Sequence, residues 1–276
     1  MTPTIQEKRR AFRALHEQGC FVLPNPWDEG SARLLQGMGF KALATTSSGL
    51  AWSRGKADGA LSRAHILEHL RTMVTATDLP VNADFESGFA ETPDGVAESV
   101  RMAMDTGVAG LSIEDATGDP LNPLREIGDA VSRIKAARAA IDMAGGETLL
   151  IGRAENFFAG RPDIDDTIRR LQAYAEAGAD CLYAPGIRSR QHIIAIVSAV
   201  HPKPVNVLIG ASSDFTLQEM ADLGVRRISV GGALARAAWG GFLQAARAIA
   251  NEGRFDQLTT TPSGSELNTC FSASAQ

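Results

Sequence analysis

The segment LPVNADFESGFAETPDGVAESVRMAMDTGVAGLSIED, residues 79–115, contains the pattern that decides the fold. A β-rich run over Leu79–Glu86 is followed by a helical pattern over Asp94–Asp105 and by a second β-rich run over Gly110–Asp115. The second run is preceded by TGVAG, a glycine turn of the kind that ends helices. A strand, a helix and a second strand in this order predict a βαβ unit with two parallel strands.

The same alternation extends along most of the chain. The β-rich runs are Cys20–Pro26, Lys41–Ser47, Leu79–Glu86, Gly110–Asp115, Thr148–Glu155, Cys181–Gly186, Pro204–Gly210 and Arg227–Gly232. Eight such units predict an α/β fold that closes into a (β/α)8 TIM-type barrel, and the chain of 276 residues suits the length of about 250 that such barrels need. The open doubly wound fold is disfavoured, because no predicted strand is followed by a G-x-G-x-x-G turn that opens a helix.

The composition is that of a globular enzyme-sized domain, with 44% hydrophobic and 21% charged residues. The net charge is −5 and the basic residues are scattered, so nucleic acid is not an expected partner. No stretch is apolar and long enough to span a membrane. Cys20, Cys181 and Cys270 have the spacing of neither a zinc site nor a disulfide framework, which favours a reducing cytoplasm as the location.

The chain is expected to form one domain. The barrel would occupy residues 1–254, including an N-terminal helix and a final helix, and residues 255–276 would form a Ser- and Thr-rich arm or a strap across a neighbouring subunit. Adjacent glycines, Gly240 and Gly241, interrupt the last helical pattern and predict a bend there, because each costs about 1 kcal/mol inside a helix. Such a bend would let the following segment leave its own barrel.

The active site of such a barrel lies at the C-terminal ends of its strands. Polar residues follow several predicted strands there: Ser48, Asp58, Asp84, Glu86, Glu114, Arg153, Glu155 and Asn206. Side chains two residues apart on a strand share a face, so Asp84 and Glu86 should point the same way. Arg153 and Glu155 should do the same.

Four carboxylates, those of Asp58, Asp84, Glu86 and Glu114, are therefore expected around one barrel mouth. Unpaired like charges in a partly buried site are costly, and a hard divalent cation would remove that cost. Oxygen ligands without His or Cys indicate Mg²⁺ or Mn²⁺ rather than zinc. The alternative is that these acids are solvated loop residues or partners in ion pairs.

Two further features suggest substrate binding. Ser48, Gly49 and Leu50 follow a strand and could aim backbone N–H groups at a carboxylate or an enolate oxygen, or could form a plain strand-to-helix turn. Arg153 could hold a substrate carboxylate through two parallel hydrogen bonds. Its alternative role is an ion pair with Glu155 or with another nearby acid.

Four strings together resemble the isocitrate lyase / phosphoenolpyruvate mutase superfamily, in matching order and spacing. They are TTSSGLAWSRGKADG (45–59), VNADFESGF (81–89), LSIEDATG (111–118) and IGRAENF (151–157). The resemblance implies a (β/α)8 barrel whose last helix is exchanged between subunits, a dimer or tetramer, and a Mg²⁺ site.

The resemblance also implies roles for individual residues. Ser48, Gly49 and Leu50 would hold the α-keto carboxylate end of the substrate, Arg153 would hold a carboxylate, and Asn206 would lie nearby. Asp84 would contact the metal directly or through water, and Asp58, Glu86 and Glu114 would complete the acidic shell. Catalytic roles fall on Arg153, Glu114, Asp58 and Asn122.

The loop Ala116–Leu124 departs from the pattern of the relatives that cleave isocitrate. Those relatives carry a Lys-(Lys/Arg)-Cys-Gly-His loop whose cysteine is the catalytic acid, whereas this loop has no cysteine, lysine or histidine. The phosphonate-handling branch has a lysine and an asparagine there, and Asn122 matches only the asparagine. Cleavage of isocitrate is therefore not expected.

The sequence thus favours a Mg²⁺-dependent lyase that cleaves or decarboxylates a small 2-oxo acid of the oxaloacetate type through a metal-stabilised enolate. Two alternatives stay open at this point. One is P–C bond chemistry on phosphonopyruvate or phosphoenolpyruvate. The other is a protein that binds oxaloacetate or 2-oxoglutarate with weak catalysis, because it lacks the proton donor of the relatives.

Overall fold

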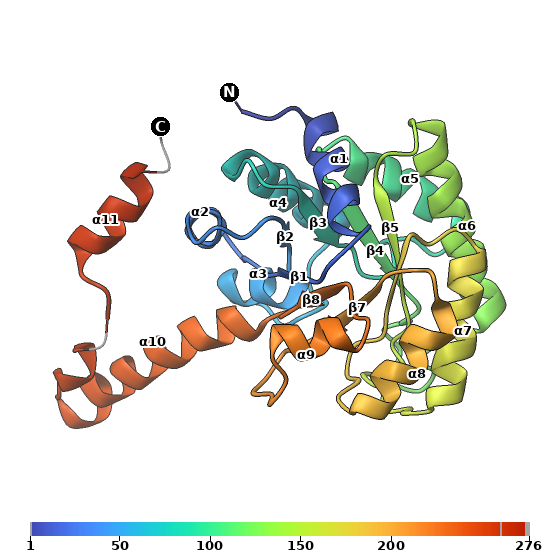
Figure 1. The fold of residues 1–276 in the computed structure, drawn as a ribbon. Coiled ribbons are helices and arrows are strands. Elements are labelled where there is room, and N and C mark those ends of the chain that lie inside the picture. Colours follow the sequence, from blue (N-terminus) through green and yellow to red (C-terminus); the bar gives the residue numbers. More distant parts are fainter. Residues whose placement is uncertain (1, 260, 274–276) are drawn as a thin grey trace.

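The computed structural model describes residues 2–259 and 261–273 and shows eight parallel strands alternating with helices (Figure 1). The strands are β1 (Phe21–Leu23), β2 (Leu43–Ala44), β3 (Val81–Asp84), β4 (Gly110–Glu114), β5 (Leu149–Arg153), β6 (Cys181–Tyr183), β7 (Val205–Leu208) and β8 (Arg227–Ser229). Each strand pairs with the next from β2 to β8, and β1 pairs with β8. The Ala44 N–H donates to the Pro24 carbonyl at 3.0 Å across the remaining gap, so the predicted (β/α)8 barrel is confirmed.

The helices surround the barrel or close its ends. They are α1 (Ile5–Leu15), α2 (Glu29–Gly37), α3 (Ser47–Ser53), α4 (Arg63–Ala76), α5 (Pro93–Met104), α6 (Ile127–Met143), α7 (Ile164–Glu176), α8 (Arg190–Val200), α9 (Leu217–Asp222), α10 (Ala233–Glu252), a 3-10 turn (Asp256–Leu258) and α11 (Gly264–Ala273). No helix of the described residues is long and apolar enough to cross a membrane.

The predicted βαβ unit forms from β3, α5 and β4. Thr92 caps α5 by accepting a hydrogen bond from the Gly95 N–H at 3.2 Å, and Pro93 occupies the first turn, where its missing N–H costs nothing. The inward face of α5 buries Val96 and Val100 against the barrel. Burial of this apolar face holds the helix across two parallel strands, which is why the sequence pattern identified the unit.

Two apolar clusters stabilise the barrel. The larger one lies between the strands and the outer helices, and it includes Ala83, Phe85 and Ala154, the residues that alternate with the polar ones at the strand ends. The smaller one fills the lower barrel interior around Phe12 of α1 and Ile151, both fully buried. Because these residues occupy the lower interior, ligand access is left to the end of the barrel where the strands finish.

All eight predicted strands are longer than those observed, and at two of them the difference changes where a site residue lies. β3 ends at Asp84 and β5 at Arg153, so Glu86 and Glu155 lie in the following turns rather than on the strands. Glu86 has a positive φ of 46°, which reverses the chain direction locally. The strand-alternation argument therefore does not hold for these two residues, although both still face the site.

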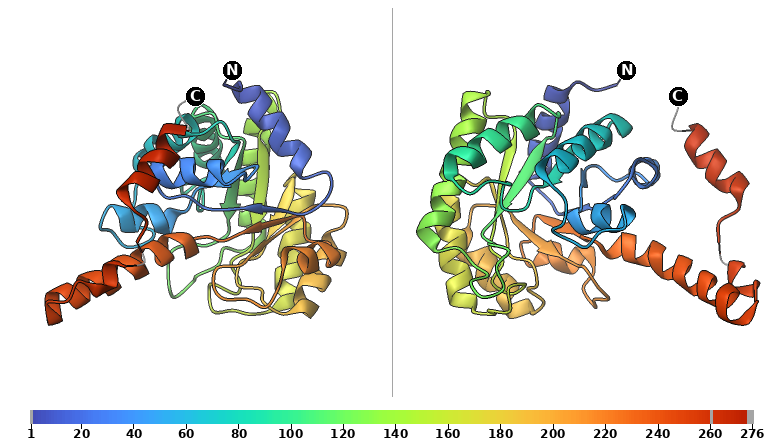
Figure 2. Two further views of the ribbon diagram at one scale, coloured as in Figure 1. Left: turned by 60° about the vertical axis from the view of Figure 1, so that its left-hand side comes forward. Right: turned by 180° about the vertical axis from the view of Figure 1, so that it is seen from behind.

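The expected bend at Gly240 and Gly241 is wrong. Helix α10 continues through both glycines and ends at Gly253, which adopts the left-handed conformation with φ of 64°. Glycine retains its N–H and can keep the helical hydrogen-bond ladder, unlike proline, so two glycines weaken a helix without bending it. Figures 1 and 2 show α10 extending away from the barrel.

The expected C-terminal arm contains regular structure. Helix α11 contacts α2 of the same chain, and the Phe271 ring lies 3.7 Å from the position that a Cβ on Gly30 would occupy. Residues 260 and 274–276 of the predicted arm lie outside the described residues. Exchange of the last helix between subunits stays a prediction.

Candidate active site

A cavity of about 1180 Å³ opens at the C-terminal ends of the strands. Its lining includes these residues that the sequence singled out: Ser48, Asp58, Asp84, Glu86, Glu114, Arg153 and Glu155. Gly49, Leu50, Asn122 and Asn206 are not part of that lining. The barrel therefore brings together residues from the ends of β2, β3, β4 and β5, as expected for this fold.

Arg153 is the centre of the charged cluster. Its Nη1 lies 3.1 Å from Asp84 Oδ1 and 3.1 Å from Glu114 Oε2, and its Nε donates to Glu155 Oε1. The guanidinium also lies over the Tyr183 ring, 5.1 Å from the ring centre. The structure thus shows the pairing with local acids that the sequence left as the alternative, and it extends this pairing to three carboxylates.

Burial and charge act in opposite directions on this cluster. Burial lowers the pKa of the Arg153 guanidinium, but the charges of Glu114 and Glu155 outweigh it and raise that pKa well above its ordinary value. Burial raises the pKa of Glu114 well above its ordinary value, although Arg153 opposes the shift. Together with Asp84, three acids share one guanidinium, so the cluster carries excess negative charge when all three are ionised, and the raised pKa of Glu114 reflects that cost.

Asp84 is held from two sides. Its Oδ2 accepts a hydrogen bond from the Ser47 N–H at 2.9 Å, and its own N–H donates to Thr45 Oγ1 at 2.9 Å. Ser47 begins helix α3, where the first N–H groups have no partner inside the helix and favour a negative charge. The strand and the helix therefore fix the Asp84 carboxylate at the cavity wall.

The segment Ser48–Leu50 forms the first turn of α3 rather than an open loop. Thr46 caps this helix, because its Oγ1 accepts the Gly49 N–H at 3.3 Å and its carbonyl accepts the Leu50 N–H at 3.1 Å. Those two N–H groups are therefore engaged within the helix, and neither residue lines the cavity. Ser48 does line it, with its hydroxyl 3.0 Å from Thr46 Oγ1.

Glu86 combines two costly features. Its φ of 46° is uncommon for a residue with a side chain, and its buried Oε1 has no hydrogen-bond partner in the described structure. Burial, followed by the charges of Asp84 and Asp58, raises the pKa of Glu86 to about 7. Such strain and desolvation gather at functional sites, and a bound cation would satisfy this oxygen.

The acidic wall does not form a closed metal cage. Within residues 2–259 and 261–273, no three His, Cys, Asp or Glu side chains gather closely enough to hold a metal ion. Arg153 separates Asp84 from Glu114 by bonding to both. Mg²⁺ commonly binds through one or two carboxylates and keeps several waters, so Asp84 and the orphaned oxygen of Glu86 fit that ion by chemistry and charge.

Asn122 and Asn206 lie away from the cavity lining. Asn122 is exposed on the loop Ala116–Leu124, and its Nδ2 donates to Asp119 Oδ2 at 3.3 Å. Asn206 is buried inside the barrel, where its Oδ1 accepts from Arg227 Nε at 2.9 Å and its Nδ2 donates to Ser229 Oγ at 3.0 Å. Asp58 is exposed but does line the cavity.

Sequence reasoning missed a buried polar layer of the cavity. Arg227 is 2% exposed, and its Nη1 lies 3.5 Å from Asn82 Oδ1 and 3.4 Å from His16 Nε2. Burial, then the charge of Arg227, lowers the pKa of His16 to about 3, so the ring stays neutral and can accept this bond. Asn82 lies two residues before Asp84, and this period-two spacing was the available signal.

A second missed network supports the acidic wall from behind. Asp115 is buried, and its Oδ2 accepts from the Tyr174 hydroxyl at 2.6 Å and from Arg170 Nη1 at 3.0 Å. Its Oδ1 accepts the Glu155 N–H at 2.8 Å. Asp115 therefore positions the turn that carries Glu155, while its neighbour Glu114 faces the cavity, as alternation along β4 requires.

The family follows from a direct match. The family model of phosphoenolpyruvate phosphomutase covers residues 12–250, which includes every strand of the barrel. The chain belongs to the phosphoenolpyruvate phosphomutase family. The relatives of this family include carbon–carbon lyases, so the protein is an enzyme of the isocitrate lyase / phosphoenolpyruvate mutase type.

Solved structures in this family resemble the whole chain. A protein of Burkholderia cenocepacia assigned as a lyase or mutase is 48% identical, with a TM-score of 0.94 over 97% of this chain and 98% of its own. A phosphonopyruvate hydrolase solved with oxalate and Mg²⁺ is 26% identical, with a TM-score of 0.85 over 97% of this chain and 96% of its own.

Relatives of known or assigned activity are more distant. A protein of Corynebacterium glutamicum assigned as a 2-methylisocitrate lyase is 30% identical over 90% of this chain and 82% of its own. An oxaloacetate decarboxylase of Bradyrhizobium diazoefficiens is 31% identical over 71% of this chain and 68% of its own. These members of the family act on different substrates, so membership alone does not name the substrate of this chain.

Proposed function

We propose that this protein is a Mg²⁺- or Mn²⁺-dependent lyase that cleaves, or decarboxylates, a small 2-oxo acid of the oxaloacetate type. The observation that carries the proposal is the charge imbalance on one wall of the cavity. Five acids line the cavity there, Asp58, Asp84, Glu86, Glu114 and Glu155, and three of them pair with the guanidinium of Arg153. A divalent cation would balance this charge.

The residues divide into two groups by what they would hold. Asp84 and Glu86 would hold the cation, and Asp58 and Glu114 would complete its acidic surroundings. When bound, the ion would supply Lewis-acid polarisation of the 2-oxo group. The oxaloacetate decarboxylase among the relatives and the Mg²⁺ and oxalate bound by the phosphonopyruvate hydrolase support this choice of metal and substrate class.

The chain itself would orient the substrate. Arg153 is held rigidly by three acids, and a substrate carboxylate would replace one of them at the guanidinium. The Ser48 hydroxyl faces the cavity and would donate to the keto-acid end. Glu114, whose pKa burial raises, suits a group that holds a proton and returns it to the cleaved fragment. Gly49, Leu50 and Asn206 would act by positioning their neighbours.

P–C bond chemistry is the second candidate. It is favoured by Asn122, which matches the phosphonate-handling relatives, and by the likeness to a phosphonopyruvate hydrolase. Asn122 lies outside the cavity lining, and its side chain bonds to Asp119 within its own loop. The loop would have to move before this asparagine could reach a substrate, which ranks the candidate second.

The test is a turnover screen of 2-oxo acids and phosphonates with Mg²⁺, read by mass spectrometry. We expect conversion of an oxaloacetate-type acid, its loss on chelation, and at least about a hundredfold loss in Asp84→Ala, because even residues that only orient a metal ligand are worth about 10–100-fold. Asp142→Ala on the outer surface of α6 is the matched control. Turnover of phosphonopyruvate alone would favour the second candidate, and tight binding without turnover would indicate a binding protein.

We also propose that the enzyme is a homo-oligomer, a dimer or a tetramer, in which α10 and the segment after it contact a neighbouring subunit. The support is the projection of α10 from the barrel and its exposed apolar side chains, among them Trp239 and Phe242. The unpaired thiols of Cys20 and Cys181 are consistent with the expected reducing cytoplasm.

A further inference from the structure

The cavity has a second wall whose chemistry differs from that of the acidic wall. It is formed by the loops that follow β6 and β7 and by the start of α10, and it carries three arginines: Arg188, Arg190 and Arg236. Two of these arginines have partners within the chain. Arg190 lies 3.4 Å from Glu219, and Arg236 donates to the Gly210 carbonyl. Arg188 makes no hydrogen bond or ion pair with the residues that the structure describes.

The second wall is also apolar below its rim. Ile187, Ile193 and Met220 line it and are nearly fully buried, with exposed fractions of 3%, 1% and 1%. Phe158 lines it as well, but 56% of that residue is exposed, which is unusual for a large aromatic side chain. These apolar side chains in the same cavity would favour a ligand that carries carbon groups as well as polar ends.

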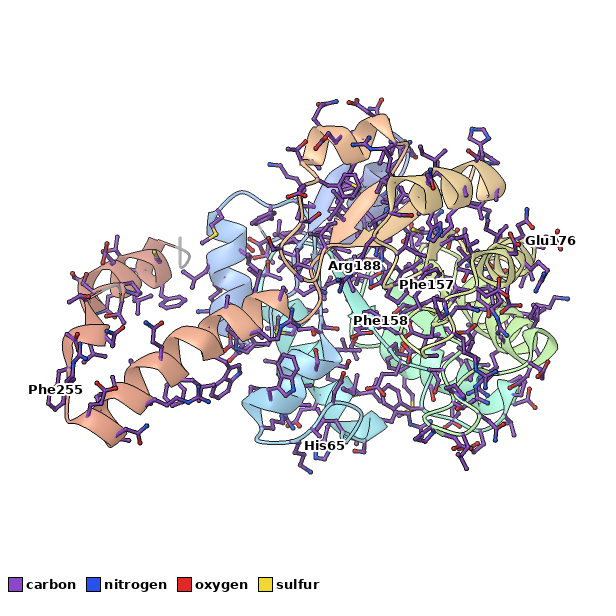
Figure 3. All side chains as sticks on the ribbon, turned by 90° about the horizontal axis from the view of Figure 1, so that it is seen from below. His65, Phe157, Phe158, Glu176, Arg188 and Phe255 are labelled. Carbon is purple, nitrogen blue, oxygen red and sulfur yellow. The ribbon has the colours of Figure 1, made fainter. Side chains whose placement is uncertain are left out.

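Arg188 and Phe158 are held close to each other by the packing of two loops. A Cβ on Gly186 would lie 2.8 Å from Phe157 Cβ and 3.1 Å from the Phe158 ring, so the loop after β6 approaches the loop after β5 more closely than any other residue would allow. The φ of 87° at Gly186 also requires glycine. Figure 3 shows Arg188 near Phe157 and Phe158 in the middle of this view.

We infer that Arg188 binds a second carboxylate of the substrate, separated by an apolar segment from the 2-oxo acid end that the acidic wall holds. This inference rests on the proposed function and narrows it to carbon–carbon cleavage of 2-oxo dicarboxylates longer than oxaloacetate, because a distal carboxylate is not β to the keto group and cannot leave through the enolate. A cavity of about 1180 Å³ exceeds the range of about 300–1,000 Å³ that encloses drug-sized ligands, so its size leaves room for the longer chain. Arginine suits this task, because its planar guanidinium matches a carboxylate.

One acid that lines the same cavity would counteract carboxylate binding at Arg188. Asp214 lines the cavity from the loop after β7 and forms no ion pair within the described residues, whereas Glu219 is neutralised by Arg190 and accepts the Thr216 N–H at 2.8 Å. Asp214 would repel a second carboxylate. Its removal should therefore strengthen binding of the same ligands that removal of Arg188 weakens.

The test compares six-carbon ligands that differ only in the distal group. Calorimetry with the full chain and Mg²⁺ would measure binding of 2-oxoadipate, which has a distal carboxylate, and of 2-oxohexanoate, which has none, with pyruvate as the common core. We expect 2-oxoadipate to bind about tenfold more tightly than 2-oxohexanoate, which corresponds to about 1.4 kcal/mol. Added salt should reduce this preference, because Arg188 is exposed.

The variants make the assignment specific. Arg188→Ala should abolish most of the preference and leave pyruvate binding unchanged, and Asp214→Asn should increase the preference. Arg161→Ala is the matched control, because Arg161 is an exposed arginine on the neighbouring loop and does not line the cavity. An equal loss of the preference in Arg161→Ala, or an unchanged preference in Arg188→Ala, would overturn this inference and leave the proposed function standing. If pyruvate does not bind the wild type at all, the proposed function fails and the inference fails with it.

Discussion

Glu86 carries a large electrostatic cost in the site. Its carboxylate is half-buried, has an oxygen without a hydrogen-bond partner, and shares the cavity wall with Asp84 and Asp58. Burial and these charges together raise its pKa to about 7 from an ordinary value of 4.5. Without a cation, ionisation of Glu86 therefore opposes folding.

This shift predicts a pH dependence of stability. Between pH 4.5 and about 7 the folded chain holds a proton on Glu86 that the unfolded chain has lost, so the contribution of Glu86 to the free energy of unfolding falls as pH rises. The loss is at most about 3.5 kcal/mol, at about 1.4 kcal/mol per pH unit over the 2.5 pH units between 4.5 and about 7. Metal-free Glu86→Gln should therefore be more stable than the wild type at pH 8 and similar to it at pH 4.5.

Urea unfolding of both proteins with a chelator present, from pH 4.5 to 8, measures this difference. Groups far from the site titrate equally in the two proteins, so the difference reports Glu86 together with Glu114, whose pKa the charge of Glu86 also raises. Parallel stability curves would show that the Glu86 carboxylate is not destabilised in the folded state. Mg²⁺ at pH 8 should stabilise the wild type more than the variant, because the ion binds the ionised carboxylate.

The loop Ala116–Leu124 follows β4, and its residues Ala116, Thr117 and Gly118 line the cavity. A bridge between Ala116 and Leu124 closes its base, and Thr117 Oγ1 donates to the Asn122 carbonyl at 2.5 Å. Asp119, its one ionisable residue, accepts the Leu121 N–H at 2.9 Å and is exposed. The side chain of Asp119 therefore stabilises the loop itself and does not line the cavity.

We predict no useful cleavage of isocitrate or 2-methylisocitrate by this protein, alongside measurable binding of smaller 2-oxo acids. The loop offers no thiol, and Asp119 faces solvent, so no group in it delivers a proton to the leaving fragment. A glyoxylate assay with isocitrate tests this for the wild type and for Asp119→Asn. Robust glyoxylate release that Asp119→Asn abolishes would show that the loop moves and that Asp119 replaces the cysteine of the relatives.

At the scale of the whole molecule, helix α10 projects from the barrel and keeps several large apolar side chains exposed. Trp239 and Phe242 pack edge to face with ring centres 5.5 Å apart and are 37% and 59% exposed. Leu243 and Ile249 on the same helix are also exposed. Exposed apolar surface on a projecting helix is typical of an interface, and a self-complementary surface gives a closed symmetric oligomer.

We expect the protein to be a dimer or a tetramer by light scattering at micromolar concentration. The double variant Trp239→Asp, Phe242→Asp should shift it towards the monomer, because buried aromatic side chains dominate interface energies. Met143→Asp is the matched control, since Met143 is 86% exposed at the end of α6. A monomeric wild type, or an unchanged oligomer in the double variant, would exclude α10 as the interface.

The sequence by itself determined the barrel and the strand ends from which the site is built. Apolar periodicity and glycine turns are local, so they identified the eight units and placed Asp84, Glu114 and Arg153 at the same end of the barrel. The family match and the cavity agree with that placement. Alternation along β4 explains why Glu114 faces the cavity while Asp115 lies behind it, a distinction that was not drawn from the sequence alone.

Only the tertiary structure decided how those residues are used. The three partners of Arg153 come from the ends of β3, β4 and β5, and their distances depend on the register between strands, which local sequence does not encode. Three other features depend in the same way on long-range packing. They are the turn at Glu86, the helical cap that engages Gly49 and Leu50, and the burial of Asn206. A residue's type and spacing give its chemistry, whereas its partners and burial exist only once distant segments meet.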